Sequence, residues 1–258
     1  MRRSPVLFAA IAVVFALVCI RLGVWQLSRL QQRRAANAVV AARLDSAVTT
    51  PAQLPADTAL ARFRRVRLRG TYDYDHEIVL AGRSHDGSPG VNLLTPLRLP
   101  GRDTAVLVNR GWVYSPDALR VDAAHWREPA DAVVTGFVET FHDPATGAAL
   151  VSGQGRTLRW LDAGTIGSLL PYPVASYYVI ASAAAPADTT RASADGADVP
   201  PMPARLDPPA LDEGSHLSYA IQWFAFAAIA LAGTGVFWWS ARRGRRVAHA
   251  PPAPPLPQ

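Results

Sequence analysis

The hydrophobic residues of this chain gather in two long runs, one near each end. The first run lies within residues 1–28 and is interrupted by Arg21, while the second lies within 216–240 and carries no formal charge. A helix needs about 20 apolar residues to cross a bilayer, and an arginine near its end can extend to the headgroups. The pattern therefore predicts a first transmembrane helix at 1–28 and a second at 216–240.

The first run has an alternative interpretation, a cleaved secretory signal. Arg2 and Arg3 would form its basic start, and Ala36-Asn37-Ala38 resembles a cleavage site. Because that site lies well beyond the end of the apolar run, we expect a membrane anchor instead.

Between the two runs the pattern changes to short alternating segments. Residues 29–50, rich in Ala, Arg and Gln, are predicted to be a helical extension and connector. Residues 51–181 are predicted to form a mostly antiparallel β domain, either a sandwich or a small barrel, with a few short helices. Pro96 predicts an edge position or a bulge within its strand. The strands are expected at 63–69, 77–81, 91–99, 105–113, 132–140, 158–162 and 176–181, and short helices at 115–125 and 163–169.

The remaining segments are polar and rich in proline. Residues 182–215 are predicted to be a disordered insertion and a Pro-rich linker, and 241–258 a basic, Pro-rich tail. Four arginines follow the second run directly, so the positive-inside rule places this tail in the cytoplasm; they are Arg242, Arg243, Arg245 and Arg246. With two spans both termini share that side, which predicts a multi-pass protein of the cell inner membrane with a periplasmic middle domain.

Charge and cysteine content narrow the function. The chain has 258 residues and a formal charge of +6, and all 26 of its basic residues are Arg. These arginines concentrate beside the apolar runs, where they are explained by the orientation of the helices in the membrane. No nucleic-acid surface is therefore predicted. The single cysteine, Cys19, excludes an internal disulfide and a paired-thiol metal site.

Enzymatic motifs are weak in this chain. Ser84-His85-Asp86 holds the residue types of a hydrolase, but such groups meet in space rather than in sequence, and a polar hairpin turn is predicted. A nucleophile elbow and a phosphate-binding glycine loop are both missing from the sequence. His76 and Glu77 are expected on one strand with opposite orientations, which disfavours a shared metal. We predict a protein that is not an enzyme.

The second apolar run has two different faces at the 100° step of a helix. His216, Tyr219 or Ala220, Trp223 and Ala227 fall on one face. On that face a haem iron could find an axial ligand and its macrocycle a stacking surface. The alternative is a helix-start histidine bonded to backbone or water. The opposite face suits close packing against the first span or a partner helix; it carries Ser218, Gln222, Ala225, Ala228, Ala232 and Gly235.

Four segments carry a resemblance to one family. Residues 22–29 look like a Leu-Gly-x-Trp-Gln-x-x-Arg signature, and 90–96 resemble a stretch leading to a Thr-Pro pair. Residues 106–113 look like a Val-x-Arg-Gly-Trp-Val strand, and 216–224 resemble His-Leu-x-Tyr-Ala-x-Gln-Trp-Phe. Together, in this order and with a helix–domain–helix layout, they resemble the Surfeit locus protein 1 family, assembly factors for haem–copper cytochrome c oxidase. Departures from its pattern are Tyr114 for a usual Pro, Ser215 for a common Asn, and an insertion at 183–199.

The resemblance implies a function that no active-site motif suggests. It implies assistance to haem a insertion or stabilisation in the catalytic subunit of the oxidase, with haem a bound transiently. The implied partners are that subunit, haem a synthase and the lipid bilayer. Carried over, His216 becomes the candidate axial ligand of the haem iron and Trp223 its neighbour. Motif residues without an assigned role are Gly23, Trp25, Gln26, Arg29, Arg110, Gly111, Trp112, Tyr219 and Gln222.

Some alternatives stay open. The chain could instead be an envelope scaffold or binding protein without haem contact, or a membrane-anchored hydrolase. For Arg110-Gly111-Trp112 one interpretation is structural: the glycine permits a bulge or a close approach, and the tryptophan fills the core. The other interpretation is contact with a partner protein.

Overall fold

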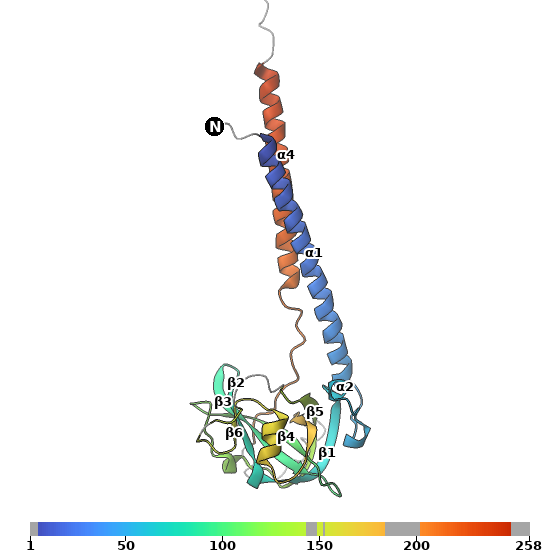
Figure 1. Cartoon of the computed structure of the whole chain (residues 1–258), viewed down its shortest axis with the longest axis vertical. Helices are drawn as coiled ribbons and strands as arrows, with labels where there is room; N and C mark the ends of the chain where they lie inside the picture. The colour runs from blue at the N-terminus through green and yellow to red at the C-terminus, as the bar shows by residue number, and fades with distance from the viewer. Residues whose placement is uncertain (1–4, 143–148, 152, 184–201, 249–258) are drawn as a thin grey trace, which may run out of the picture. The chain divides into compact units, whose positions relative to one another are not determined.

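In a computed structural model the chain forms two long helices and a β domain (Figure 1). The structure describes residues 5–142, 149–151, 153–183 and 202–248. Two compact units result, each described by itself: Met1–Val39 together with Leu211–Gln258, and Val40–Ala210.

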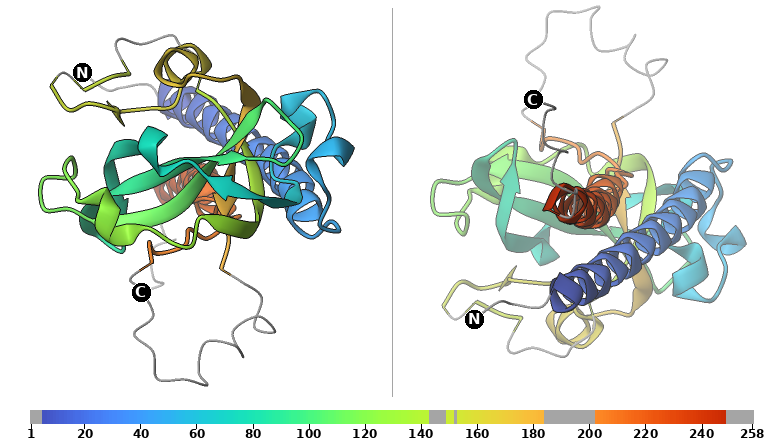
Figure 2. Two further views of the ribbon diagram at one scale, coloured as in Figure 1. Left: turned by 90° about the horizontal axis from the view of Figure 1, so that it is seen from below. Right: turned by 90° about the horizontal axis from the view of Figure 1, so that it is seen from above.

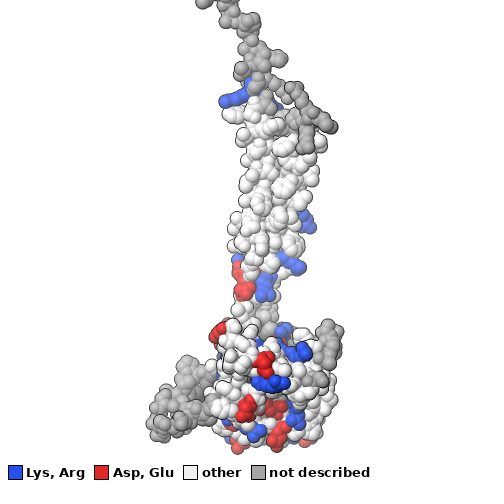
Figure 3. Space-filling model, turned by 90° about the vertical axis from the view of Figure 1, so that its left-hand side faces the viewer, with Lys and Arg blue, Asp and Glu red and all other residues white. Residues whose placement is uncertain are grey.

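The two long helices are α1, Pro5–Leu44, and α4, His216–Ala248. Both are long and apolar enough to cross a membrane, which confirms the two predicted helices. The first helix continues without a break into the expected extension, and the second continues past Ser240 through the arginine cluster. Figure 3 shows the helices with a long uncharged surface bounded by charged side chains.

The described residues of the β domain form seven strands and two short α-helices. Its sheet has the order β1-β5-β7-β4-β3-β2-β6, and an additional antiparallel pairing of β1 with β3 closes five of the strands into a small barrel (Figure 2). All pairings are antiparallel except β4–β7 and β2–β6. The elements are α2 Thr58–Ala61, β1 Arg65–Tyr72, β2 Ile78–His85, β3 Ser88–Arg98, β4 Ala105–Tyr114, β5 Asp131–Thr140, β6 Thr157–Leu158, α3 Ala163–Leu169 and β7 Val174–Ala181.

Alternation along β1 shows how the sequence closes the barrel. Arg65, Arg67 and Arg69 face outward, while Val66 and Leu68 point into the interior and are almost fully buried. Each strand that lines the interior contributes β-branched or leucine side chains to one cluster. The cluster includes Val66, Leu68, Leu97, Val106, Val108, Val134, Val138 and Val179.

A second hydrophobic cluster lies between the sheet and α3. Ile78, Leu94 and Leu107 contribute from the strands, and Leu158 and Ile166 from β6 and α3. Asp162 caps α3, because its carboxylate accepts the N–H of Thr165 at 2.8 Å. The expected strand at 158–162 is therefore wrong beyond Leu158, since its last residue begins a helix.

The hairpin between β2 and β3 is tighter than predicted. Asp86 and Gly87 both have positive φ, 49° and 78°, as a two-residue type I′ turn requires. The strands consequently extend to His85 and restart at Ser88. Ser84, His85 and Asp86 thus belong to a polar hairpin, as predicted.

Pro96 lies in the middle of the sheet, contrary to the expectation of an edge or bulge. It pairs with Leu107 of β4, and on its other side the neighbouring strand changes from β2 at Leu94 to β1 at Leu97. Its carbonyl accepts the N–H of Asp73 on that side, so its ring nitrogen also faces this gap. The missing N–H therefore costs no ladder hydrogen bond.

The helix expected at 115–125 is absent, and the described chain there contains only a 3₁₀ turn, Ala123–Trp126. The carboxylate of Asp117 accepts the hydroxyl of Ser115 and the N–H groups of Leu119 and Arg120. Such local side-chain bonds satisfy the backbone without a helix.

Candidate functional site

The two long helices pack along a seam of small residues. Ala16 and Cys19 of α1 form one buried cluster with Ala227 of α4. A Cβ on Gly23 would lie 2.7 Å from the ring of Phe224, so this glycine permits the close approach. One row of less exposed positions on each helix recurs at alternating intervals of three and four residues, as in left-handed helix packing, and Leu22, Leu27 and Phe224 lie beside these rows; the rows are Ala9, Ala12, Ala16, Cys19, Gly23, Gln26 and Leu30 on α1, and His216, Ala220, Trp223, Ala227, Ala230 and Thr234 on α4.

The face of α4 that contacts α1 is therefore the one that begins at His216. The small-residue face that begins at Ser218 and includes Gln222 was expected to suit packing against the first span or a partner helix, but it is exposed along its length. The reason is that the His216 face of α4 also carries small residues, Ala220 and Ala227, which allow close approach. The bulky Trp223 on that face fits beside the small side chains of α1. For the first span, the small-residue prediction named the wrong face.

His216 meets Gln26 at one end of this seam. The imidazole Nδ1 lies 2.8 Å from Gln26 Oε1, although 190 residues separate them in sequence. Both side chains are half-buried. Because Gln26 Oε1 can only accept, this hydrogen bond requires a proton on Nδ1, and a neutral ring then has its lone pair on Nε2. At Nδ1, this helix-start histidine therefore bonds a side chain of the other helix and not the backbone.

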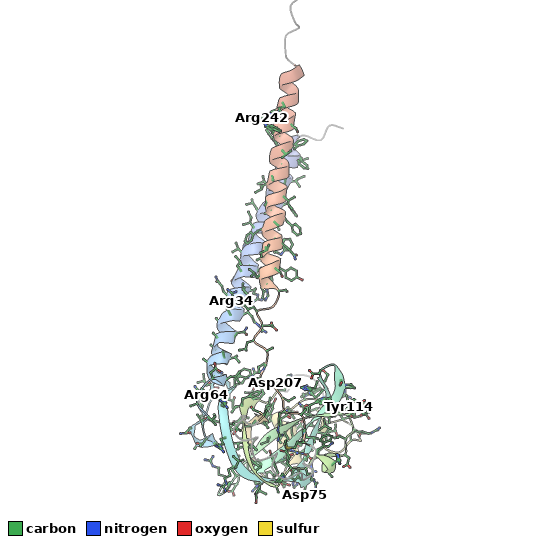
Figure 4. The ribbon with its side chains drawn as sticks, turned by 180° about the vertical axis from the view of Figure 1, so that it is seen from behind. Arg34, Arg64, Asp75, Tyr114, Asp207 and Arg242 are labelled. Atoms are coloured by element: carbon green, nitrogen blue, oxygen red, sulfur yellow. The ribbon has the colours of Figure 1, made fainter. Side chains whose placement is uncertain are left out.

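A charged clasp lies next to this pair. Arg34 holds the carboxylate of Glu213 with two hydrogen bonds of 2.7 and 2.8 Å, while Arg33 and Asn37 donate to the carbonyl of Asp212. The hydrogen bond from Arg34 lowers the pKa of Glu213. Figure 4 labels Arg34 near this end of the uncharged helix surface and Arg242 near the other. Sequence reasoning used these charges only for orientation, although opposite charges at facing helix ends are a signal for such a clasp.

The other motif residues of the helices have different surroundings. Trp223 packs in the seam against the Ala16 cluster, with its ring edge-on to Phe226. Trp25 is 45% exposed and lies under the guanidinium of Arg29 at 5.7 Å. Tyr219, which is 47% exposed, and Gln222 point away from the seam.

Arg110 is the most deeply buried charged residue of the described chain. Its guanidinium is fully buried, 2.5 Å from Glu77 and 3.2 Å from Glu128. Further hydrogen bonds join it to Thr95 and to the carbonyl of Trp126. Glu77 therefore faces the barrel network, whereas His76 lies in a 3₁₀ turn and not on a strand as expected. His76 bonds Asp73 instead.

Gly111 and Trp112 receive a returning segment of the chain. The backbone of Trp112 exchanges two hydrogen bonds of 2.8 Å with Ala204, and Arg205 bonds Glu128 and the carbonyl of Arg110. Gly111 has φ 135° and lies at a bulge, and a Cβ there would be 2.3 Å from the Ala204 oxygen. The glycine thus provides both the bulge and the close approach that the structural interpretation expected.

Two expectations for this region change. Trp112 is half-buried over Gly90 and against His85, and does not fill a hydrophobic cluster. Within the predicted disordered insertion and linker, 182–215, residues 184–201 lie outside the described residues. The segment that begins at 202 is docked through Ala204 and Arg205.

Asp73 organises a second polar cluster in the β domain. It accepts hydrogen bonds from Tyr172 at 2.5 Å and, in the ion-pair geometry, from His76 at 2.8 Å. Burial alone would raise the pKa of Asp73, but these hydrogen bonds outweigh it and hold the pKa below its usual range.

These features define a class: a protein with two helices that are long and apolar enough to cross a membrane, a small β barrel between them in the sequence, and a hydrogen-bonded His–Gln pair in the helix seam. The sequence profile of the SURF1 family matches residues 13–228, and the chain belongs to this family. The SURF1 family consists of cytochrome c oxidase assembly factors and is not a known class of enzymes.

Individual relatives agree with this assignment. The chain is 26% identical to a SURF1-like protein of Monosiga brevicollis over 82% of its own length and 80% of the relative's. It is also 26% identical to an uncharacterised SURF1-like protein of Mycobacterium tuberculosis, over 96% and 88% of the two chains. Surfeit locus protein 1 of Takifugu rubripes is 32% identical over 36% of this chain and 45% of the relative.

Proposed function

We propose that this protein assists haem a insertion or stabilisation in the catalytic subunit of cytochrome c oxidase, and that His216 would hold the haem through its imidazole. The observation that supports this is the hydrogen bond from His216 Nδ1 to Gln26, which leaves Nε2 as the coordinating nitrogen. A bound haem a would supply the redox-active iron. The protein's own residues hold the imidazole and set its direction.

The surroundings of His216 fit a haem better than a free metal ion. No group of three or more His, Cys, Asp or Glu that could hold an ion occurs among the described residues. A single imidazole is sufficient for a macrocycle that already provides four nitrogen ligands. Arg29 and Arg33 lie at the same end of the helix pair and suit the propionate groups of a haem.

The proposed function requires a definite orientation. The C-terminal arginines, among them Arg242 and Arg243, favour a cytoplasmic C-terminus. With two spans the N-terminus is cytoplasmic as well, and the barrel lies in the periplasm, on the outer side of the inner membrane. His216 then lies at the periplasmic end of its span, where the oxidase catalytic subunit and haem a synthase are the proposed partners.

One observation favours a second candidate, an assembly scaffold that binds no haem. Trp223 is packed against Ala16 and Cys19 in the helix seam, so its ring is not free to stack on a macrocycle. In that case the His216–Gln26 pair serves helix association alone. The structure gives Trp223 a packing role, and its role as a haem neighbour stays a prediction.

The test is a haem spectrum of the detergent-purified protein produced with haem a synthase. We expect a haem a absorbance band in the wild type that is lost in His216→Ala and retained in His125→Ala, a matched change at an exposed histidine of the barrel. Gene deletion should reduce assembled oxidase. Haem-free wild-type protein combined with a deletion defect would support the scaffold, and normal oxidase after deletion would reject both.

A further inference from the structure

Gln26 and His216 are polar side chains at one end of the seam, whose other positions are small or apolar residues and Thr234. Its position continues the three–four spacing of Cys19 and Gly23 on α1, and His216 begins the corresponding row on α4. A polar pair at such a position fixes which residues face each other, because any shift of the helices would leave both groups without a partner.

The contact also decides which ring nitrogen of His216 is available. Neutral imidazole carries one proton, and the carbonyl oxygen of Gln26 accepts it at Nδ1. Nε2 is left as the acceptor. The neighbouring residue Gly214 has φ 67° and no side chain, and a Cβ there would lie 4.0 Å from Nε2. The contact with Gln26 thus holds Nδ1 and leaves the lone pair of the neutral ring on Nε2.

The other groups near His216 do not compete for Nδ1. Arg34 is engaged by Glu213, and Arg33 and Asn37 by the carbonyl of Asp212. Gln26 is the single side chain to which the described structure bonds the ring. Orientation of the imidazole therefore depends on Gln26 rather than on the charged clasp.

We propose that Gln26 is the positioning residue for His216: it holds the Nδ1-protonated tautomer and directs Nε2 to the haem iron. This inference rests on the proposed haem role. Histidine ligands of metals generally donate their second N–H to an acceptor that fixes the ring and raises its basicity, and loss of that acceptor typically weakens binding about 10–100-fold. A glutamine from a helix 190 residues away supplies this acceptor here.

The experiment uses two independent readouts on the detergent-purified full chain. The first is ¹⁵N NMR of labelled histidine in haem-free protein, which reports the tautomer of His216 without any cofactor. The second is titration with ferric haem b as a probe, followed by its absorbance band. His216→Ala identifies the His216 signals in both measurements.

We expect the wild type to show a protonated Nδ1 and an unprotonated Nε2. Gln26→Leu should lose this pattern and bind the haem probe about 10–100-fold more weakly. Gln26→Glu, which keeps the length and the acceptor, should retain both properties. Gln31→Leu is the matched control, because Gln31 is an exposed glutamine of the same helix, and it should behave as the wild type.

Three results would overturn the proposal: an Nε2-protonated ring in the wild type, an unchanged tautomer in Gln26→Leu, or unchanged haem affinity in that variant. If Gln26→Leu does not fold, Gln26→Glu still tests whether an acceptor alone maintains the tautomer. Absence of haem binding by the wild type would reject the haem role, while the NMR measurement would still show whether Gln26 orients His216.

Discussion

At the scale of single residues, the most notable feature of the barrel is the buried guanidinium of Arg110. The side chain of Arg110 has no exposed surface, and Glu77 and Glu128, which are themselves nearly buried, stabilise its charge. Burial alone would lower the pKa of Arg110, but the two carboxylates outweigh that effect and hold the guanidinium charged. Arg205 adds a second positive charge to Glu128, so each buried charge has a partner.

Arg110→Leu should therefore destabilise the barrel by about 3–5 kcal/mol, because Glu77 would remain buried without its cation. Chemical denaturation followed by near-UV circular dichroism measures the change in the free energy of unfolding. Arg67→Leu, on the exposed face of β1, is the control and should change it by less than about 0.5 kcal/mol. Equal stability of the two variants would contradict the assigned role of the network.

At the scale of elements, the helix seam joins the two ends of the chain. Its α1 side consists mainly of Ala, Cys and Gly, so that the backbones approach closely and larger side chains such as Phe224 fill the remaining space. In a bilayer this packing cannot draw on the hydrophobic effect, and the polar His216–Gln26 pair contributes specificity. The seam places the two most distant motifs side by side.

The single cysteine of the chain provides a test of this seam. Cys19 and Ala227 share a buried cluster, so Ala227→Cys should form a disulfide with Cys19 under mild oxidation. Mass spectrometry of the cross-linked peptides detects the product. Ala228→Cys, one residue along on the exposed face, should react several-fold less within the same chain. Comparable cross-linking of both variants would contradict the seam.

At the scale of the whole molecule, the order helix–barrel–helix imposes one constraint on topology. Both chain ends must lie on one side of the membrane if both helices cross it. The arginines beyond Ser240 carry the proposal that this side is the cytoplasm, through the positive-inside rule, since the charges flanking α1 are divided between its two ends.

Cysteine labelling of cells tests this orientation. In a Cys19→Ala background, Tyr114→Cys on the exposed surface of the barrel should react with a membrane-impermeant maleimide once the outer membrane is opened (Figure 4). Ser240→Cys, which precedes the arginines of α4 and is cytoplasmic in the proposed topology, should react only after lysis. Labelling of Ser240→Cys alone in unlysed cells would reverse the proposed topology.

Local patterns account for what could be predicted of the fold. The alternation of arginines with Val66 and Leu68 predicted β1, and the Asp86-Gly87 pair lies within the predicted turn. Errors arose where local bonding or tertiary neighbours overrode the pattern. Hydrogen bonds to the side chain of Asp117 stabilise a turn in place of the predicted helix. Pro96 lies in the middle of the sheet at the point where the neighbouring strand of β3 changes and no N–H is needed.

The candidate site was predictable in its residues but not in its contacts. His216 and Gln26 were both recognised as motif residues, yet nothing in the spacing joins positions 190 residues apart. Likewise Arg110, Gly111 and Trp112 formed one motif, while their partners Glu77, Glu128 and Ala204 come from three distant segments. Whether His216 binds haem stays a prediction.

The sequence by itself determined the two apolar helices, the strand-rich domain between them and the family, because length, alternation and motif order are local properties of the chain. Tertiary structure decided that the sheet closes into a barrel, which face of α4 meets α1, and that Gln26 holds His216. Those outcomes depend on which side chains fit together across the chain. Both faces of α4 carry small residues, and the complementary shape and polarity of α1 choose between them.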